Sequence, residues 1–404
     1  MGDGRHDKFF KNLGFKSWLT MFDINFYMQS HALIKEIDNG KEFSKLELYS
    51  YFEKIRSKDP IVYNIETTNA CNMRCKMCPR TSRMTRKISF LETDYYEDVI
   101  KQLKPHDKKL WIKWEQFCID NYGISSTDGP SENHFFLYVI PKVIQLHGYG
   151  DPLLDKNIGK VVNTLTKNNL ESYFSCTPAN IEVMKTIEMM DLGLGYLKYS
   201  YESTDDAKFK EIRGNAANFQ EAYDKTIQVL NEKEKRGLST EIIITMIDIG
   251  HDQKQQEEFA QLSEAFKGLD VYVYLKSEDQ QWYRKDETLK DYLQSNKRDL
   301  PSQEDDYYGT NSIHWQEFCK HPWMSMSIKS DGEVHMCMED YNNEIFLGNS
   351  YENSLSEIWN GDLYDKFRKD HFDLTPCIKC TEECDMSLVG NKLNNRTNLE
   401  ILSS

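Results

Sequence analysis

The sequence of 404 residues lacks an uninterrupted apolar run that approaches the roughly 20 residues of a membrane-spanning helix. Its first residues, MGDGRHDKFF, lack the charged start and apolar stretch of a secretory leader, so we expect no signal peptide. It also lacks an internal repeat of the roughly 20–50 residues that build solenoids and propellers. These absences predict a cytoplasmic protein that does not bind a membrane.

The chain also lacks an excess of positive charge. Lysine and arginine number 50 against 65 aspartates and glutamates, so the formal net charge is -15. A nucleic-acid-binding surface needs a dense positive field. We therefore expect no nucleic acid among the partners.

The ten cysteines are unevenly placed: eight form two groups, and only Cys118 and Cys176 stand apart. In a chain without a leader, the reducing cytosol disfavours disulfides, and clustered thiols indicate metal or redox chemistry.

Short β-rich runs alternate with helical stretches from residue 61 onward. The expected strands are 61–67, 143–148, 171–176, 196–201, 241–248 and 271–276, and the expected helices are 92–104, 155–168, 181–191, 217–236 and 252–267. This alternation predicts an α/β fold with a parallel sheet that curls toward a barrel. In such barrels the chemistry lies at the C-terminal ends of the strands.

The pattern divides the chain into an N-terminal helical extension (1–60), a barrel (61–276), a linker (277–310) and a cysteine-rich C-terminal domain (311–404). The stretch 105–142 is longer than an ordinary connection between a strand and a helix. Long loops in compact domains are often lids or substrate elements; a surface insertion without function is the alternative.

The first cysteine group is Cys71, Cys75 and Cys78, directly after the first expected strand. Zinc sites normally take four protein ligands, and no fourth Cys or His lies nearby. Three thiolates on a cubane iron–sulfur cluster leave one iron open for another ligand. A zinc loop is the alternative.

Cys71-x3-Cys75-x2-Cys78 at the end of the first strand resembles the signature loop of the radical S-adenosylmethionine (radical SAM) superfamily. The resemblance implies a partial (β/α)6 TIM-like barrel with a [4Fe-4S] cluster whose open iron binds S-adenosylmethionine (SAM). It also implies reductive cleavage of SAM to a 5′-deoxyadenosyl radical, which abstracts hydrogen from a substrate. An electron donor such as flavodoxin or ferredoxin would be a partner.

Other positions match the family in order along the chain. His147-Gly148-Tyr149-Gly150-Asp151-Pro152 is similar to the family's Gly-Gly-Glu-Pro motif, with Tyr149 and Asp151 as departures. The resemblance implies that residues at the ends of the second, third and fourth strands contact SAM, followed by an Arg-Gly step. These cofactor-binding candidates are Gly148, Gly150, Asp151, Pro152, Ser175, Thr177, Asn180, Ser200, Glu202 and Arg213.

The second cysteine group consists of Cys319, Cys337, Cys377, Cys380 and Cys384. Asp331-Gly332 predicts a β-hairpin turn before Cys337, and a short helix is expected around Leu355 to Trp359. The spacing resembles the SPASM domain or its shorter form, Twitch. Five cysteines imply one auxiliary [4Fe-4S] cluster, as in 2-deoxy-scyllo-inosamine dehydrogenase, on Cys319, Cys337, Cys377 and Cys380, with Cys384 as a substitute; a zinc site is the alternative.

An auxiliary cluster could receive an electron, which favours oxidation of a small polar metabolite such as a sugar or aminocyclitol. The first 60 residues look too short for a peptide-recognition module. Cys176 is a candidate hydrogen donor and His147 a candidate base. The alternatives are a ribosomal-peptide-modifying enzyme, catalysing epimerisation or crosslinking, and a non-enzymatic iron–sulfur redox sensor.

Overall fold

The computed structural model describes residues 22–39, 41, 43, 45–92, 95–105, 107–128, 131–247, 253–276, 321–337 and 340–372. The predicted linker, 277–310, and the cysteines at 319, 377, 380 and 384 lie outside these residues. None of the described helices is long and apolar enough to cross a membrane.

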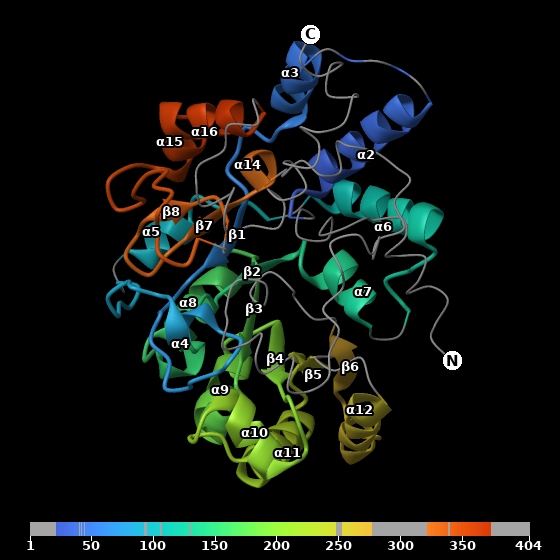
Figure 1. Ribbon diagram of the computed structural model, residues 1–404, viewed down its shortest axis with the longest axis vertical. Coiled ribbons are helices and arrows are strands. Elements are labelled where there is room, and N and C mark those ends of the chain that lie inside the picture. The colour runs from blue at the N-terminus through green and yellow to red at the C-terminus, as the bar shows by residue number, and fades with distance from the viewer. Residues whose placement is uncertain are drawn as a thin grey trace.

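One eight-stranded sheet organises the described chain, in the order β6-β5-β4-β3-β2-β1-β7-β8. The strands are β1 (Val62–Ile65), β2 (Val143–Gln145), β3 (Glu171–Cys176), β4 (Tyr196–Ser200), β5 (Glu241–Ile247), β6 (Tyr272–Lys276), β7 (Met326–Ile328) and β8 (Val334–His335). Every neighbouring pair from β6 to β7 is parallel, and only β7 and β8 pair antiparallel. Figure 1 shows the strands as a curved row from β8 to β6.

Helices cover both sides of this row. They are α2 (Ile24–Asp38), α3 (Lys45–Ile55), α4 (Pro79–Ser82), α5 (Tyr96–Ile100), α6 (Lys108–Tyr122), α7 (Glu132–His134), α8 (Ile158–Lys167), α9 (Val183–Asp191), α10 (Asp206–Arg213), α11 (Phe219–Arg236), α12 (Gln253–Ala265), α14 (His321–Met324), α15 (Leu355–Trp359) and α16 (Asp362–Phe372). In Figure 1, α6 and α7 lie on one side of the sheet and α8 and α9 on the other. We call the side of α6 and α7 the inner face.

Local sequence explains where these elements begin and end. In α8, Ile158, Val161, Val162 and Leu165 are buried, and this spacing places them on one helical face. Helix α11 begins where the side chain of Asn218 accepts a hydrogen bond from Glu221 N, and it ends at Gly237 with φ +64°. Side-chain caps and left-handed glycines satisfy the free backbone groups at helix ends.

All six predicted barrel strands are confirmed, and so is the hairpin at Asp331-Gly332, where Gly332 has φ +83°. The predicted α/β fold with a parallel barrel sheet is therefore correct. The structure adds that the hairpin is hydrogen-bonded to the barrel: Ile65 pairs with Ile328, and Glu66 N donates to Ile328 O at 2.8 Å. The pairing of β1 with β7 could not be predicted from the sequence, because backbone hydrogen bonds between distant strands do not depend on a residue pattern in either strand.

One side of the insertion 105–142 is buried, while Ile112 and Ile119 on α6 are exposed. Its residues Trp114, Cys118, Tyr122 and the π-helix η2 (Phe135–Val139) are buried in a second hydrophobic core on the inner face. Inner-face residues of β3 to β6 complete this core: Tyr173, Tyr196, Ile243 and Tyr274. These contacts do not support the alternative of a surface insertion without function. They show instead that the insertion packs on the inner face of the sheet.

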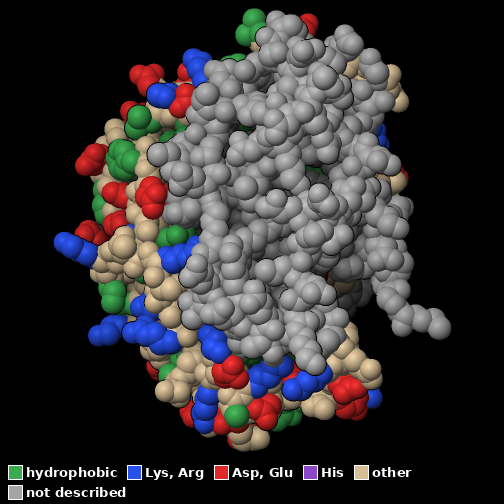
Figure 2. All heavy atoms as spheres, in the orientation of Figure 1, with side chains coloured by type: hydrophobic (Ala, Val, Ile, Leu, Met, Phe, Trp, Pro, Cys, Tyr) green, Lys and Arg blue, Asp and Glu red, His purple; other side chains and the backbone are tan. Residues whose placement is uncertain are grey.

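The visible part of the surface carries charges of both signs. Figure 2 shows Lys and Arg side chains beside Asp and Glu over the left and lower parts of the molecule, where side chains are coloured. Exposed ion pairs include Lys235–Glu232 at 2.8 Å and Lys267–Glu264 at 3.0 Å. Such pairs contribute little to stability.

Trp359 on α15 lies in the same hydrophobic core as Ile65 and Phe174 of the barrel strands, so we expect the C-terminal helices to stabilise the barrel. Trp359 on α15 is fully buried, and its Nε1 donates to Ser57 O at 2.8 Å. We expect Trp359→Ala to lower the free energy of unfolding by about 3–5 kcal/mol, measured by anaerobic chemical denaturation. Leu363, which is 49% exposed on α16, supplies the control: equal losses from Trp359→Ala and Leu363→Ala would contradict this packing.

Candidate iron–sulfur and S-adenosylmethionine site

The cysteine loop 71–78 follows β1 and lies against the end of α10. Arg74 N donates to Arg213 O and Lys76 N to Ile212 O, both at 3.0 Å. These backbone hydrogen bonds hold the loop that follows β1 against α10, the helix that follows β4. Three thiols that are close in sequence are thereby held at the C-terminal edge of the sheet, where barrel enzymes place their chemistry.

The three thiols influence one another electrostatically. Burial raises the pKa of Cys71 to about 11 and that of Cys78 to about 12, and neighbouring thiols of the group add to both shifts. Cys75 is buried. Thiolates are the form that binds metal, so loading this site would release protons.

A cation lies beside the thiols. Arg213 Nη1 is 3.5 Å from Cys75 Sγ, and Nη2 is paired with Glu202. Its Nε is buried and has no partner within the described chain. The other Glu202 oxygen accepts a hydrogen bond from Ile247 N at 3.1 Å. Sequence analysis expected Arg213 and Glu202 to contact SAM; here they form an ion pair next to a cluster ligand.

This arrangement fits a cluster. In a cubane each thiolate binds its own iron, and after β1 three thiols lie within a span of eight residues. A buried arginine suits the negative charge of such a cluster. Cys71, Cys75 and Cys78 would hold it.

The loop after β2 touches the cysteine loop directly. Asp151 N donates to Ala70 O at 2.8 Å, and a Cβ on Gly150 would come within 2.1 Å of Thr68 O. Only glycine allows this approach. Pro152 begins the 3-10 helix η3 (Pro152–Leu154), capped by the Asp151 side chain.

Asp151, Asn180 and Asn72 form a chain of hydrogen bonds that ends beside Cys71. Asn180 Nδ2 donates to Asp151 Oδ2 at 2.7 Å, and the two asparagine amides lie 2.8 Å apart. Burial raises the pKa of Asp151, although the Asn180 amide opposes this shift. The structure thus brings together the ends of β2 and β3 and the cysteine loop, as the predicted SAM site requires.

The remaining predicted contacts lie along the same edge. Ser175 Oγ on β3 is 3.4 Å from Ser200 Oγ on β4. Thr177 caps the 3-10 helix η4 (Pro178–Asn180) through Ala179 N. A Cβ on Gly148 would come within 2.2 Å of Glu66 Oε2.

Glu66, which sequence analysis missed, is fully buried at the end of β1. Its carboxylate pairs with Arg86 through two hydrogen bonds of 2.8 Å and accepts further bonds from Tyr149 N and Ser330 Oγ. Burial alone would raise its pKa, but Lys329 and Arg86 lower it to about 2. In the sequence, Glu66 stands out as a carboxylate that directly follows a strand of mostly apolar residues.

His147 and Lys198 lie on the inner face. His147 Nδ1 accepts a hydrogen bond from Ser175 N at 3.2 Å, and burial, with help from Lys198, lowers its pKa to about 3. Lys198 Nζ lies 5.1 Å from the Phe135 ring and 5.7 Å from the Tyr173 ring. These contacts favour a positioning role for His147. They identify Lys198, a lone lysine in an otherwise uncharged strand, as a base candidate that sequence analysis missed.

The two isolated cysteines lie in hydrophobic cores. Cys176 shares the outer core with Phe174, on the opposite side of β3 from Ser175, and Cys118 is fully buried on α6. Burial raises the pKa of both thiols. Because Cys176 points to the side of β3 opposite Ser175, its position does not favour the hydrogen donation predicted for it.

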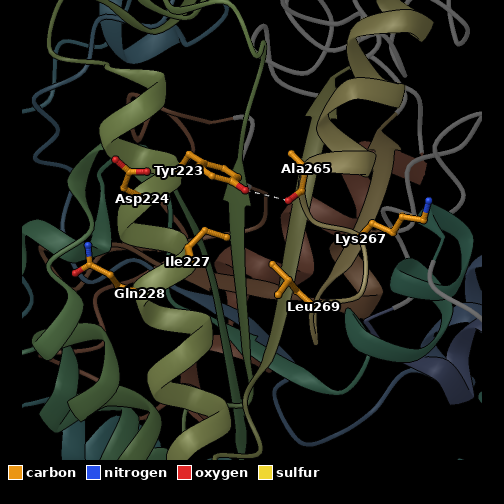
Figure 3. Close-up of a pocket in the computed structure, with 7 residues that line it drawn as sticks. All are labelled: Tyr223, Asp224, Ile227, Gln228, Ala265, Lys267 and Leu269. Carbon is orange, nitrogen blue, oxygen red and sulfur yellow. Dashed lines mark hydrogen bonds between the residues drawn. The ribbon is translucent and has the colours of Figure 1, made fainter.

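A cavity of about 610 Å³ lies on the outer layer of helices. Figure 3 shows its lining from α11 and the end of α12, where Tyr223 Oη donates to Ala265 O at 3.1 Å. None of the predicted site residues lines it, so it is separate from the cysteine loop.

Comparison with known proteins identifies the C-terminal segment. Residues 319–381 match the SPASM family, an iron–sulfur cluster-binding domain. The match spans four of the five predicted auxiliary ligands, and of these the structure describes Cys337, just after β8. No curated protein matches the sequence.

Solved structures show a distant likeness of fold. "BtrN in complex with AdoMet and 2-DOIA" is 15% identical, covers 77% of this chain and 86% of that chain, and has a TM-score of 0.39. Streptococcus suis SuiB bound to precursor peptide SuiA is 16% identical (80% and 71% covered, TM-score 0.47), and anSMEcpe with bound AdoMet is 11% identical (84% and 97% covered, TM-score 0.46).

The close approach at Gly150 gives a first prediction for the site. We expect Gly150→Ala to displace the cysteine loop, because its Cβ would meet the backbone oxygen of Thr68, and overpacking of this kind costs about 1–3 kcal/mol. Anaerobic reconstitution should then leave the chain with about half the iron of the unsubstituted protein. Gly159→Ala, whose Cβ would meet a flexible Leu192 side chain at 3.3 Å, should load normally; equal loading of both variants would contradict the prediction.

The buried amine of Lys198 gives a second prediction, which concerns how the stability of the protein depends on pH. Burial lowers its pKa to about 7; Lys276 and Arg213 act in the same direction, and Glu132 and Glu202 oppose them. Between about pH 7 and pH 10 the unfolded chain binds the extra proton, so this residue makes stability rise with pH, by up to about 1.4 kcal/mol per unit.

We expect Lys198→Met to flatten this rise in denaturation curves recorded between pH 6 and 9. Lys267→Met, at a 72% exposed side chain, should leave the slope unchanged. An unaltered slope in Lys198→Met would contradict the assignment.

Proposed function

We propose that this chain is a radical SAM enzyme that oxidises a small polar metabolite, with a [4Fe-4S] cluster on Cys71, Cys75 and Cys78 and an auxiliary [4Fe-4S] cluster that includes Cys337. The observation that carries the proposal is the cysteine loop at the C-terminal edge of a parallel barrel sheet, with Arg213 Nη1 3.5 Å from Cys75 Sγ. The SPASM match supports the second cluster.

Bound to these residues, the clusters and SAM would supply abstraction of a hydrogen atom and uptake of one electron. The chain's own groups position the reactants. Asp151 and Asn180 form a polar wall beside Cys71 for the amino and hydroxyl groups of SAM. Gly150 keeps the two loops close enough for a ligand to contact both backbones.

The inner face suits a polyol or aminocyclitol. Ser175 and Ser200 supply adjacent hydroxyls, and Lys198 supplies an amine that is partly neutral near pH 7. In oxidation of an alcohol, the carbon loses one hydrogen atom, and the hydroxyl proton and one electron must then leave. Lys198 is the group that takes the proton. The adjacent hydroxyls of Ser175 and Ser200 on β3 and β4 favour this substrate class over an apolar one.

The test is an anaerobic assay of the reconstituted, reduced protein with SAM and a panel of C-deuterated polyols, aminocyclitols and peptides. We expect about eight irons per chain, 5′-deoxyadenosine in amounts above a Cys71→Ala control, and deuterium transfer from one of the polar metabolites. The product should be two hydrogens lighter. Lys198→Met should still form 5′-deoxyadenosine but yield about 100-fold less product, as for loss of a general base.

Other outcomes separate the alternatives. Deuterium transfer only from peptides would show a peptide-modifying enzyme. Iron-loaded protein that forms no 5′-deoxyadenosine would indicate a redox sensor. If one of the two cysteine sites binds zinc in place of iron, the assignment of a cluster to that site is wrong.

A further inference from the structure

The imidazole of His147 takes the place of a backbone acceptor at the end of β2. The last hydrogen bond of the ladder between β2 and β3 runs from Leu146 N to Tyr173 O at 2.8 Å. The next amide of β3 on that side belongs to Ser175, because every second residue of a strand faces the same neighbour. This amide donates to His147 Nδ1 at 3.2 Å. A side chain therefore continues the hydrogen-bond pattern of the sheet beyond the end of β2.

This hydrogen bond fixes the tautomer of the ring. A backbone N–H can only donate, so His147 Nδ1 must hold a lone pair, and the proton of the neutral ring then lies on Nε2. Burial, with help from Lys198, lowers the pKa of His147 to about 3, so the ring stays neutral at about pH 7. In this state His147 Nε2 is a hydrogen-bond donor.

The ring and the backbone of His147 are both held in place. Tyr173 packs against the ring edge to face, with the ring centroids 5.1 Å apart and the planes at 85°. The His147 carbonyl oxygen accepts a hydrogen bond from Asn64 Nδ2 at 2.5 Å, and Asn64 Oδ1 accepts one from Ser327 Oγ at 2.7 Å. Because the ring cannot turn without breaking these contacts, the direction of its Nε2–H bond is fixed.

The Nε2–H group of His147 is available to a ligand. Among the residues that the structure describes, none accepts a hydrogen bond from it, and His147 is only partly buried. Polar groups that are largely removed from water normally have a hydrogen-bond partner. Ligand sites use a few such groups, held in one direction, to orient what they bind.

The amine of Lys198 lies beside the same tyrosine. Its Nζ is 5.7 Å from the centre of the Tyr173 ring, and Lys198 pairs in register with Ser175, whose amide holds His147. The hydroxyls of Ser175 and Ser200, 3.4 Å apart, lie on the same two strands. An N–H donor, an amine and two hydroxyls thus belong to one stretch of the C-terminal edge, from the end of β2 to β4.

We propose that His147 binds the substrate, donating a hydrogen bond from Nε2 to the oxygen of the hydroxyl group that is oxidised. The inference rests on the proposed function, in which Lys198 takes the proton of that hydroxyl. Once the carbon has lost a hydrogen atom and the hydroxyl its proton, negative charge develops on the oxygen until the electron passes to the auxiliary cluster. A fixed N–H donor stabilises such a charge. His147 itself neither gains nor loses a proton.

Two amide variants separate this role from a purely structural one. Asparagine carries its amide at the level of Nδ1, so it can keep the hydrogen bond from Ser175 N but does not reach the position of Nε2. Glutamine carries its amide at the level of Nε2, so it can keep the donor but has no acceptor at the level of Nδ1.

Both variants are assayed anaerobically with the C-deuterated polyol or aminocyclitol of the panel that transfers deuterium. We expect His147→Gln to keep most of the product formed per 5′-deoxyadenosine and His147→Asn to lose about 100-fold, as for removal of one donor to a developing charge. The reverse order would overturn the proposal, because the ring would then act only as an acceptor for β3. Equal yields from the two variants would contradict it as well.

A second measurement does not depend on turnover. In the full chain with ring-¹⁵N histidine, nuclear magnetic resonance reports on ten histidines, and the signals that disappear in His147→Gln belong to His147. We expect an unprotonated Nδ1 and a protonated Nε2 at about pH 7, with a shift of the Nε2 signal when the polyol or aminocyclitol is added. A proton on Nδ1 would overturn the inference even if neither variant is active.

Failure of the proposed function gives a different result. If the unsubstituted, iron-loaded protein forms 5′-deoxyadenosine but no polyol or aminocyclitol transfers deuterium, the substrate class is wrong, and the role of His147 falls with it. If the unsubstituted protein oxidises such a metabolite and His147→Asn does so equally well, the proposed function stands and the role of His147 is refuted.

Discussion

The buried carboxylate of Glu66 lies where β1 ends and where the strand of the auxiliary hairpin runs beside it. It accepts hydrogen bonds from Arg86, from the Tyr149 amide in the loop after β2 and from Ser330 of the hairpin. Loss of one partner of such a pair would leave a buried charge uncompensated, at a cost of about 3–5 kcal/mol. The end of β1, the loop after β2 and the hairpin of β7 and β8 therefore meet at one side chain.

Acidic residues outnumber basic ones in this chain, which has a net charge of -15, yet one buried cation lies beside a thiol: Arg213 Nη1 is 3.5 Å from Cys75 Sγ. A buried cation near a thiolate favours the charged form of the ligand and the reduced form of a cluster.

The sequence predicted those strands, turns and helices whose characteristic residue patterns lie within a single segment. The six barrel strands, the Asp331-Gly332 hairpin and the helix Leu355–Trp359 agree with the structure within a few residues, because alternation, turn residues and helical spacing lie within each segment. Contacts between distant segments leave no such signal: the pairing of β7 with β1 and the salt bridge of Glu66 went unpredicted. Glu202 was assigned to SAM from its place after β4, whereas its charge partner Arg213 is visible only in three dimensions.

The central claim is that the three thiolates after β1 leave one iron open for SAM. It is tested most directly by electron paramagnetic resonance of the reduced protein in which Cys319, Cys337, Cys377, Cys380 and Cys384 are replaced by alanine. The spectrum of the remaining cluster should shift when SAM is added and broaden further with ¹⁷O-carboxylate SAM. If the spectrum of the cluster does not change when SAM is added, a fourth side chain occupies the open iron, and the account is wrong.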